Sequence, residues 1–136
     1  MNEIELIRPE GLFASPAFSQ VAVIPPGATT IHVGGQNAVD SSGALVGGDD
    51  VAAQTRQVMD NLMTALAGAG VGIEHLVSVT VLLVEGVDVN EAYAAAAASL
   101  GGAAVNPPLV VAAIVSGLGV PDALAEVSAL AAVVRS

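Results

Sequence analysis

Cysteine, lysine and tryptophan are all missing from this sequence, and each absence excludes a kind of chemistry. Without cysteine the chain has no disulfide, no thiolate metal site and no thiol nucleophile. Without lysine, Schiff-base chemistry through a lysine side chain is excluded. Aromatic residues are almost as scarce, since only Phe13, Phe18 and Tyr93 occur, so the core has to consist mainly of small aliphatic side chains.

Positive charge is also nearly absent. Arg8, Arg56 and Arg135 stand against 13 acidic residues, which gives a formal net charge of −10. A chain of this charge repels a phosphate backbone, so we expect no nucleic-acid partner. The acidity itself is typical of an apolar chain that relies on net charge to resist aggregation.

Long apolar runs are lacking too. Every apolar stretch is broken by glycine, proline or charge before it reaches the roughly 18 residues of a transmembrane helix, so we expect no membrane partner. The first residues, MNEIELIRPE, carry acidic side chains where a signal peptide carries basic ones, and we expect a cytoplasmic protein. Hydrophobic residues nevertheless make up 54% of the chain, which excludes disorder.

The pattern of the remaining residues indicates one domain over residues 1–136, of the α+β class. The first three strands are expected at 2–8, 18–24 and 29–34. Because Pro25-Pro26-Gly27 is a strong turn signal, the second and third of these strands are predicted to pair as a β-hairpin.

The first helix is expected over 51–70. Asp49 or Asp50 is a suitable N-cap, and Gly70 is a suitable stop. Gln54 lies mostly off the apolar stripe of this helix.

The second helix starts at the capping-box-like pair Asp88 and Glu91, runs to about Leu100 and ends at Gly101-Gly102. Further strands are expected at 76–84, 109–115 and 123–134. The element order is therefore βββ-α-β-α-ββ, which predicts a six-stranded mixed sheet with both helices on one face.

Segments 76–84 and 109–115 are apolar on both faces, although the helices cover only one face of such a sheet. The second face has to be hidden as well. We therefore expect it to be buried in a symmetric homo-oligomer.

A succession of short segments occurs here in an order and spacing typical of one protein family. The segments are Ser15–Gln20, Val33–Gln36, Asp50–Gly70, Val77–Val81, Val89–Tyr93, Pro107–Leu118 and Ala125–Ala132. They are similar to that family's "GPY" and "SGQ" blocks, first helix, following strand, "N..Y" pair, "PAR" hairpin and last strand. This succession covers nearly the whole chain and resembles the Rid (reactive intermediate deaminase, YjgF/UK114-like) family.

The resemblance implies a chorismate-mutase-like (YjgF-like) fold that assembles as a homotrimer, with the sheets packed inward. It further implies a small-molecule ligand, bound in a cleft at each subunit interface. We expect no cofactor, and two histidines without cysteine also predict no metal site.

Deaminase members of the family carry an arginine in the "PAR" block that pairs with the carboxylate of a 2-imino acid. The matching position here is Leu109. Three other positions differ as well, since Phe18 replaces a tyrosine, Gly34 a serine, and Ser128 an acidic residue of the last strand. We therefore expect no ordinary 2-imino acid deamination, and we expect the neighbouring Glu126 to face away from Ser128.

The candidate ligand-binding residues follow from the same resemblance. They are Phe18, Gly34, Gly35, Gln36, Asn90, Tyr93, Leu109, Ser116 and Ser128. Ser128, Asn90 and Tyr93 are the catalytic candidates, with structural hydrogen bonding or packing as their alternative roles.

Both histidines are expected to be structural or solvated. His32 is expected to be partly buried in its strand, and His75 to be solvated in a loop. The sequence leaves open whether Arg56 or Arg135 reaches a cleft.

Three functions stay open at this point. The first is a homotrimer that binds a small, largely neutral or apolar metabolite in its inter-subunit clefts, without archetypal 2-imino acid deaminase activity. The second is an enzyme, a hydrolase or deaminase with a modified active site, acting on a reactive imine, enamine or related intermediate. The third is a structural or interaction role with a vestigial cleft. Saturable binding without turnover would indicate the metabolite-binding homotrimer, and turnover would indicate the enzyme. The absence of both would indicate the structural or interaction role.

Overall fold

The main sheet has four strands and mixed pairing. The computed structural model describes residues 3–100 and 106–135, and within them the strand order is β3-β6-β4-β5. The strands are β3 (Thr29–Gln36), β4 (Leu76–Val84), β5 (Leu109–Val115) and β6 (Ala125–Val133). β6 pairs antiparallel with β3 and β4, whereas β4 and β5 are parallel, as the α-helical crossover between them allows.

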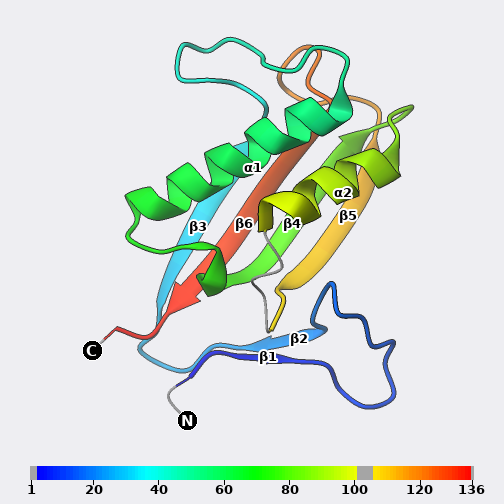
Figure 1. Cartoon of the computed structure of the whole chain (residues 1–136). Coiled ribbons are helices and arrows are strands. Elements are labelled where there is room, and N and C mark those ends of the chain that lie inside the picture. Colours follow the sequence, from blue (N-terminus) through cyan, green and yellow to red (C-terminus); the bar gives the residue numbers. More distant parts are fainter. Residues whose placement is uncertain (1–2, 101–105, 136) are drawn as a thin grey trace.

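Two α-helices, α1 (Val51–Gly68) and α2 (Val89–Leu100), lie side by side on one face of this sheet (Figure 1). A short 3₁₀ helix, η1 (Ile73–His75), leads into β4. The predicted element order and the placement of both helices on one face are thereby confirmed.

The caps explain where the helices start. The carboxylate of Asp50 accepts the amide protons of Ala52 and Ala53, and that of Asp88 accepts those of Asn90 and Glu91. Beyond the last turn of α1 the backbone of Gly70 has φ +77°, a conformation that glycine adopts without strain. The predicted stop of α2 at Gly101-Gly102 lies outside the described residues.

The prediction of a single six-stranded sheet was wrong. β1 (Glu5–Ile7) and β2 (Val21–Val23) form a separate two-stranded antiparallel sheet below the main one (Figure 1). Each has only three residues, and the two pair with each other and not with a strand of the main sheet.

The predicted hairpin between the second and third strands was also wrong. The turn Pro25-Pro26-Gly27 does reverse the chain locally, and Gly27 has φ +84°. However, β2 pairs with β1, and β3 pairs with β6 at the opposite end of the sequence. A turn signal indicates a change of direction, but it does not establish that the flanking strands are hydrogen-bonded to each other.

The core lies between the helices and the main sheet. α1 contributes Val58, Leu62 and Leu66, and β6 contributes Val127 and Ala131. Gln54 is fully buried as well, contrary to the stripe predicted for α1. Its amide group satisfies the carbonyls of Gly48 and Asp122 and the amide of Leu124, so burial leaves none of these polar groups unpaired.

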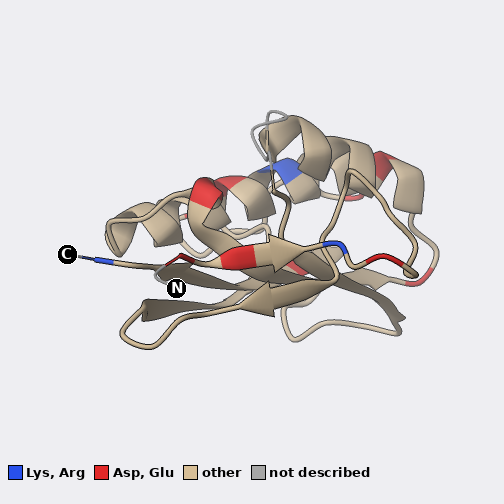
Figure 2. Cartoon of the chain, turned by 90° about the horizontal axis from the view of Figure 1, so that it is seen from below, with Lys and Arg blue, Asp and Glu red and all other residues tan. Residues whose placement is uncertain are grey.

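The other face of the main sheet, here called the open face, is covered by no helix of residues 3–100 and 106–135. Alternation along the strands places Leu82, Val111 and Leu130 there. β5 is an edge strand and is exposed along most of its length. Val111, on the open face, is 62% exposed, whereas Ile114 is 54% exposed but neighbours the buried Leu83 and points to the other face. In Figure 2 the acidic residues mark mainly helices and loops, while the strands of the main sheet are largely uncoloured. The described residues include no helix long and apolar enough to span a bilayer.

Candidate functional site

A β-bulge at Gly34-Gly35 defines one end of the candidate site. Val33 pairs with Ala129 and Gln36 with Val127, so β3 has one more residue than β6 in this interval. The carboxyl group of Glu126 lies directly over Gly35, because a Cβ atom built on Gly35 is 2.9 Å from Glu126 Cδ and Oε2. Gly35 thus makes room for a carboxylate next to the bulge.

Glu126 and Ser128 lie on the same face of β6, so the expectation that they face apart was wrong. Glu126 pairs with Leu82 and Ser128 with Thr80, and residues two apart in a strand point the same way. Ser128 and Thr80 are cross-strand neighbours on the open face. The last strand therefore carries one carboxylate on this face, two residues before Ser128, the position that matches the family's acidic residue.

Side-chain amides hold this end in place. Gln36 Nε2 donates to the Gly34 carbonyl at 3.1 Å and so braces the bulge. The amide of Asn37 donates to the Ala125 carbonyl, and Asn61 on α1 donates to the carbonyls of Asn37 and Val39. Gln36 therefore has a structural role in this subunit.

Asn90, Tyr93 and Ser116 lie beyond the carboxyl ends of β4 and β5. Asn90 and Tyr93 are in the first turns of α2, and both are exposed. Their side chains make no hydrogen bond to any described residue, which leaves them available to a ligand or a neighbouring subunit. The exposed Ser116 follows directly after β5.

Leu109 and Phe18 lie at the opposite end of the sheet. Leu109 is the first residue of β5, and the Ser19 amide donates to the Pro108 carbonyl at 3.1 Å. This bond fastens the loop that carries Phe18 to the start of β5. The hydroxyl of Ser19 is buried and has no partner within the described part of the chain.

One subunit thus separates the candidate residues into two groups. β5 has seven residues, and at about 3.3 Å per residue it spans roughly 20 Å between Leu109 and Ser116. Gly34, Gly35 and Gln36 lie on β3, which β6 and β4 separate from β5 and Leu109. Ser128 lies between the two groups, on β6. A small ligand cannot contact both groups within one chain.

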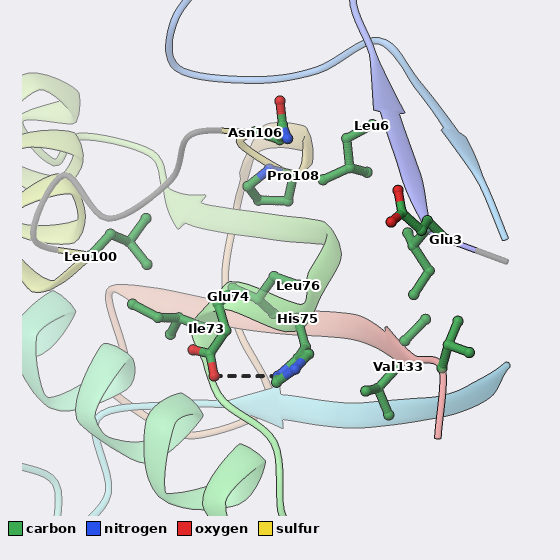
Figure 3. Close-up of a pocket in the computed structure, with 13 residues that line it drawn as sticks. Glu3, Leu6, Ile73, Glu74, His75, Leu76, Leu100, Asn106, Pro108 and Val133 are labelled. Atoms are coloured by element: carbon green, nitrogen blue, oxygen red, sulfur yellow. Dashed lines mark ion pairs between the residues drawn. The ribbon is translucent and has the colours of Figure 1, made fainter. Parts of the chain in front are cut away.

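The histidines belong to neither group. His32 is exposed, contrary to the expected partial burial, and it neighbours Leu130 on the open face. His75 is not in a solvated loop but in η1, where its Nδ1 accepts the Gly72 amide proton and lies 3.4 Å from Glu74 Oε1 (Figure 3).

A hollow of about 500 Å³ lies beside His75, between η1, β1 and the end of β6 (Figure 3). Leu6, Ile73 and Val133 contribute apolar walls, and Glu3 and His75 contribute polar groups. It contains none of the sequence-predicted ligand residues, and nothing in the sequence pattern signalled it.

A second hollow, of about 590 Å³, lies where the amino-terminal ends of both helices meet. Acidic side chains dominate its lining, but those of Asp50 and Asp88 are engaged as helix caps. No three His, Asp or Glu side chains within 3–100 and 106–135 are grouped as metal ligands.

Two of the three arginines lie away from Leu109, the position that matches the family's guanidinium. Arg135 Nη2 donates to the Ala69 carbonyl at the end of α1, and Arg56 is exposed on that helix. Arg8, which the sequence pattern did not single out, donates from Nε to the Phe18 carbonyl at 3.4 Å. Arg8 and Phe18 are ten positions apart in the sequence, so the place of Arg8 near the candidate site is seen only in the structure.

The pKa of Asp40 is lowered, and this residue lies outside both groups of candidates. Hydrogen bonds from the Ser42 hydroxyl and from the amides of Ala44 and Ser42 lower the pKa of Asp40. This carboxylate organises an exposed turn after β3, so its perturbation does not indicate catalysis.

Comparisons with known proteins agree with this architecture. The family model described as Endoribonuclease L-PSP matches residues 11–133. YyfB of Yersinia pestis, a protein of the Rid family, is 31% identical and has a TM-score of 0.84 over 98% of this chain and 100% of that chain. No curated protein matches the sequence.

More distant structures share the fold. TdcF of E. coli, solved with bound serine, has a TM-score of 0.69 at 20% identity over 93% of this chain and 100% of its own. Rv2704 of Mycobacterium tuberculosis, of the YjgF/YER057c/UK114 family, has a TM-score of 0.60 at 24% identity over 96% and 100% of the two chains. The family match spans most of the sequence and the fold agrees throughout, so this chain belongs to the YjgF/Rid family.

Proposed function

We propose that this protein is a homotrimer that binds a small, uncharged or weakly polar metabolite in clefts between its subunits, without deaminating 2-imino acids. The observation that carries the proposal is the separation of the candidate residues. Leu109 and Phe18 lie at one end of the sheet, and Glu126 and the Gly34-Gly35 bulge lie across it, so only contact between two subunits can join them.

The open face supports assembly. It exposes apolar side chains along β5, and Val111 alone is 62% exposed. An extended apolar surface on a water-exposed sheet is typical of an interaction site. A cyclic arrangement, in which one end of each subunit meets the other end of its neighbour, forms a closed ring of identical clefts.

The absence of deamination follows from the chemistry at Leu109. A carboxylate needs a guanidinium or an equivalent donor set, and Leu109 provides only an apolar surface. The related fold of TdcF holds serine, which supports a small-molecule site in this family fold. In the present chain the ligand of that site has no arginine in β5 to bind its carboxylate.

Glu126 favours a second candidate function. Its carboxylate lies over Gly35 on the face that also carries Ser128, and an acidic group in the last strand is what the family's deaminases use to position water. The second candidate is therefore a hydrolase that acts on an imine or enamine without a carboxylate.

The first test combines mass and turnover. Light scattering after gel filtration is expected to give three times the chain mass. In the same preparation, 2-aminoacrylate generated in situ is expected to lose ammonia no faster with the wild type than without protein. A monomer would refute the cleft, and accelerated ammonia release would refute the absence of deamination.

A matched variant separates geometry from chemistry. Leu109→Arg restores the guanidinium, and mixed trimers of wild type with Leu109→Arg/Glu126→Gln place the introduced guanidinium of one subunit opposite Glu126 of another. Ammonia release in Leu109→Arg and in the mixture, but not in the double variant alone, is the expected signature of a shared cleft. Release by the double variant alone would contradict a role for Glu126.

A further inference from the structure

Two of the three aromatic residues of the chain lie in one loop, which joins β1 to β2. Phe13 is 75% exposed, more than any other large hydrophobic residue among those described, and its neighbour Leu12 is 53% exposed. Phenylalanine is usually buried, so a ring left in water calls for an occupant that covers it.

The two rings form a pair. The centroids of Phe13 and Phe18 are 6.4 Å apart and the ring planes are tilted by 39°. This separation is within the range at which aromatic rings attract each other. Because Phe18 is only partly exposed and Phe13 is largely exposed, the pair presents one covered ring and one free ring.

The loop is held by side-chain donors at both ring positions. Gln20 Nε2 donates to the Phe13 carbonyl at 3.2 Å, and Arg8 Nε donates to the Phe18 carbonyl at 3.4 Å. The Ser15 hydroxyl also accepts the Ala17 amide proton at 3.1 Å. Such bonds preorganise the rings, so a ligand would bind without having to order the loop.

The place of the pair in the fold indicates what it recognises. The Ser19 amide donates to the Pro108 carbonyl, which places Phe18 next to the start of β5 and therefore near Leu109. Leu109 is apolar and the chain carries a net charge of −10, so both the surface at this position and the overall charge disfavour an anion. Arg8 is the nearby cation, and its Nε donates to the Phe18 carbonyl. A planar uncharged group can pack against the free ring without needing that cation.

We propose that Phe13, paired with Phe18, is a specificity-determining residue of the inter-subunit cleft and selects a planar, uncharged ligand group. This inference rests on the proposed function, because Leu109 and the loop are one wall of the proposed cleft. It assigns a role to a residue outside the succession of family blocks.

Benzamide and benzoate test the proposal, because they have nearly the same shape and differ in charge. Binding to the full chain is followed by saturation-transfer NMR titration, with mass measured on the same samples. The wild type is expected to bind benzamide saturably and benzoate at least tenfold more weakly. Phe13→Ala and Phe13→Leu are expected to weaken benzamide binding at least fivefold, whereas the exposed neighbour variant Leu12→Ala leaves it unchanged.

Each other outcome overturns the proposal in a distinguishable way. Equal benzamide affinity in wild type and Phe13→Ala removes the role of the ring. Tighter binding of benzoate, lost in Arg8→Gln, identifies an anion site instead. A trimer that dissociates in Phe13→Ala identifies Phe13 as a subunit contact, and a wild-type trimer that binds neither probe refutes the ligand class while the proposed cleft stands. A wild-type monomer refutes the proposed function itself.

Discussion

At the scale of single residues, buried polar groups determine how loops are fastened to this fold. Gln54 joins three main-chain groups from two loops that are far apart in the sequence. A glutamine on a helix gives no sign of such partners, which is why its burial was not predicted. Glu126 is a different case, since its face could have been predicted from Ser128 by strand alternation alone.

Replacing Gln54 with leucine is expected to lower the free energy of unfolding by about 2–4 kcal/mol, because three buried main-chain groups lose their partner. Urea denaturation measures the change. Gln57→Leu on the same helix is the control, since Gln57 Nε2 bonds only Asn61 Oδ1, and its expected loss is below about 1 kcal/mol. An equal decrease in the free energy of unfolding in both variants would show that the buried hydrogen bonds of Gln54 do not stabilise the fold more than the bond between Gln57 and Asn61.

The two adjacent glycines of the bulge offer a matched pair. A methyl group at Gly35 meets the Glu126 carboxyl at 2.9 Å, whereas one at Gly34 meets nothing within 4 Å. Gly35→Ala is therefore expected to displace the Glu126 carboxylate with little change in Tm, because the end of a flexible side chain can move aside. The ¹³C shift of the Glu126 carboxyl carbon reports the displacement, and Gly34→Ala should leave that shift unchanged.

At the scale of elements, the sequence predicted the helices and the main strands closely. Periodicity and caps are local, so the start of α1 at Val51, the limits of β4 and those of β5 were all predictable. Strand partners are not local. β2 and β3 flank a strong turn signal but pair with β1 and β6, so the predicted hairpin and the six-stranded sheet failed together.

The candidate site shows the same limit more sharply. The family resemblance correctly indicated the fold, and the residue types at Leu109 and Gly34 are read directly from the sequence. The sequence does not show that these two positions lie on opposite edge strands of the main sheet. Their joint action in a cleft stays a prediction about two subunits.

The cap of α1 gives a prediction at this scale. Asp50→Ala removes the acceptor of two amide protons and is expected to lower the free energy of unfolding by about 1 kcal/mol. Thermal unfolding measures it against Asp49→Ala, whose exposed side chain accepts no hydrogen bond from a described residue. A larger loss of stability in Asp49→Ala than in Asp50→Ala would show that Asp49, and not Asp50, is the N-cap of α1.

At the scale of the whole molecule, the open face of the main sheet is the feature that bears most directly on assembly. Val111→Asp puts a charge on the edge strand of that face and is expected to dissociate the proposed trimer into folded smaller species, because the side chain is mostly exposed within one chain. Light scattering and circular dichroism measure mass and folding together. Thr64→Asp, on the exposed surface of α1, is the charge-matched control, and an intact trimer in both variants would place the interface elsewhere.

The last strand of the sequence is also an inner strand of the main sheet. β6 lies between β3 and β4, and Thr29 pairs with Val133. During synthesis, β3 therefore has no strand partner until β6 has left the ribosome, however early the first helix forms. A chain that lacks residues 125–136 keeps the β4–β5 pair, but β3 then has no strand to pair with and the main sheet cannot close around its inner strand.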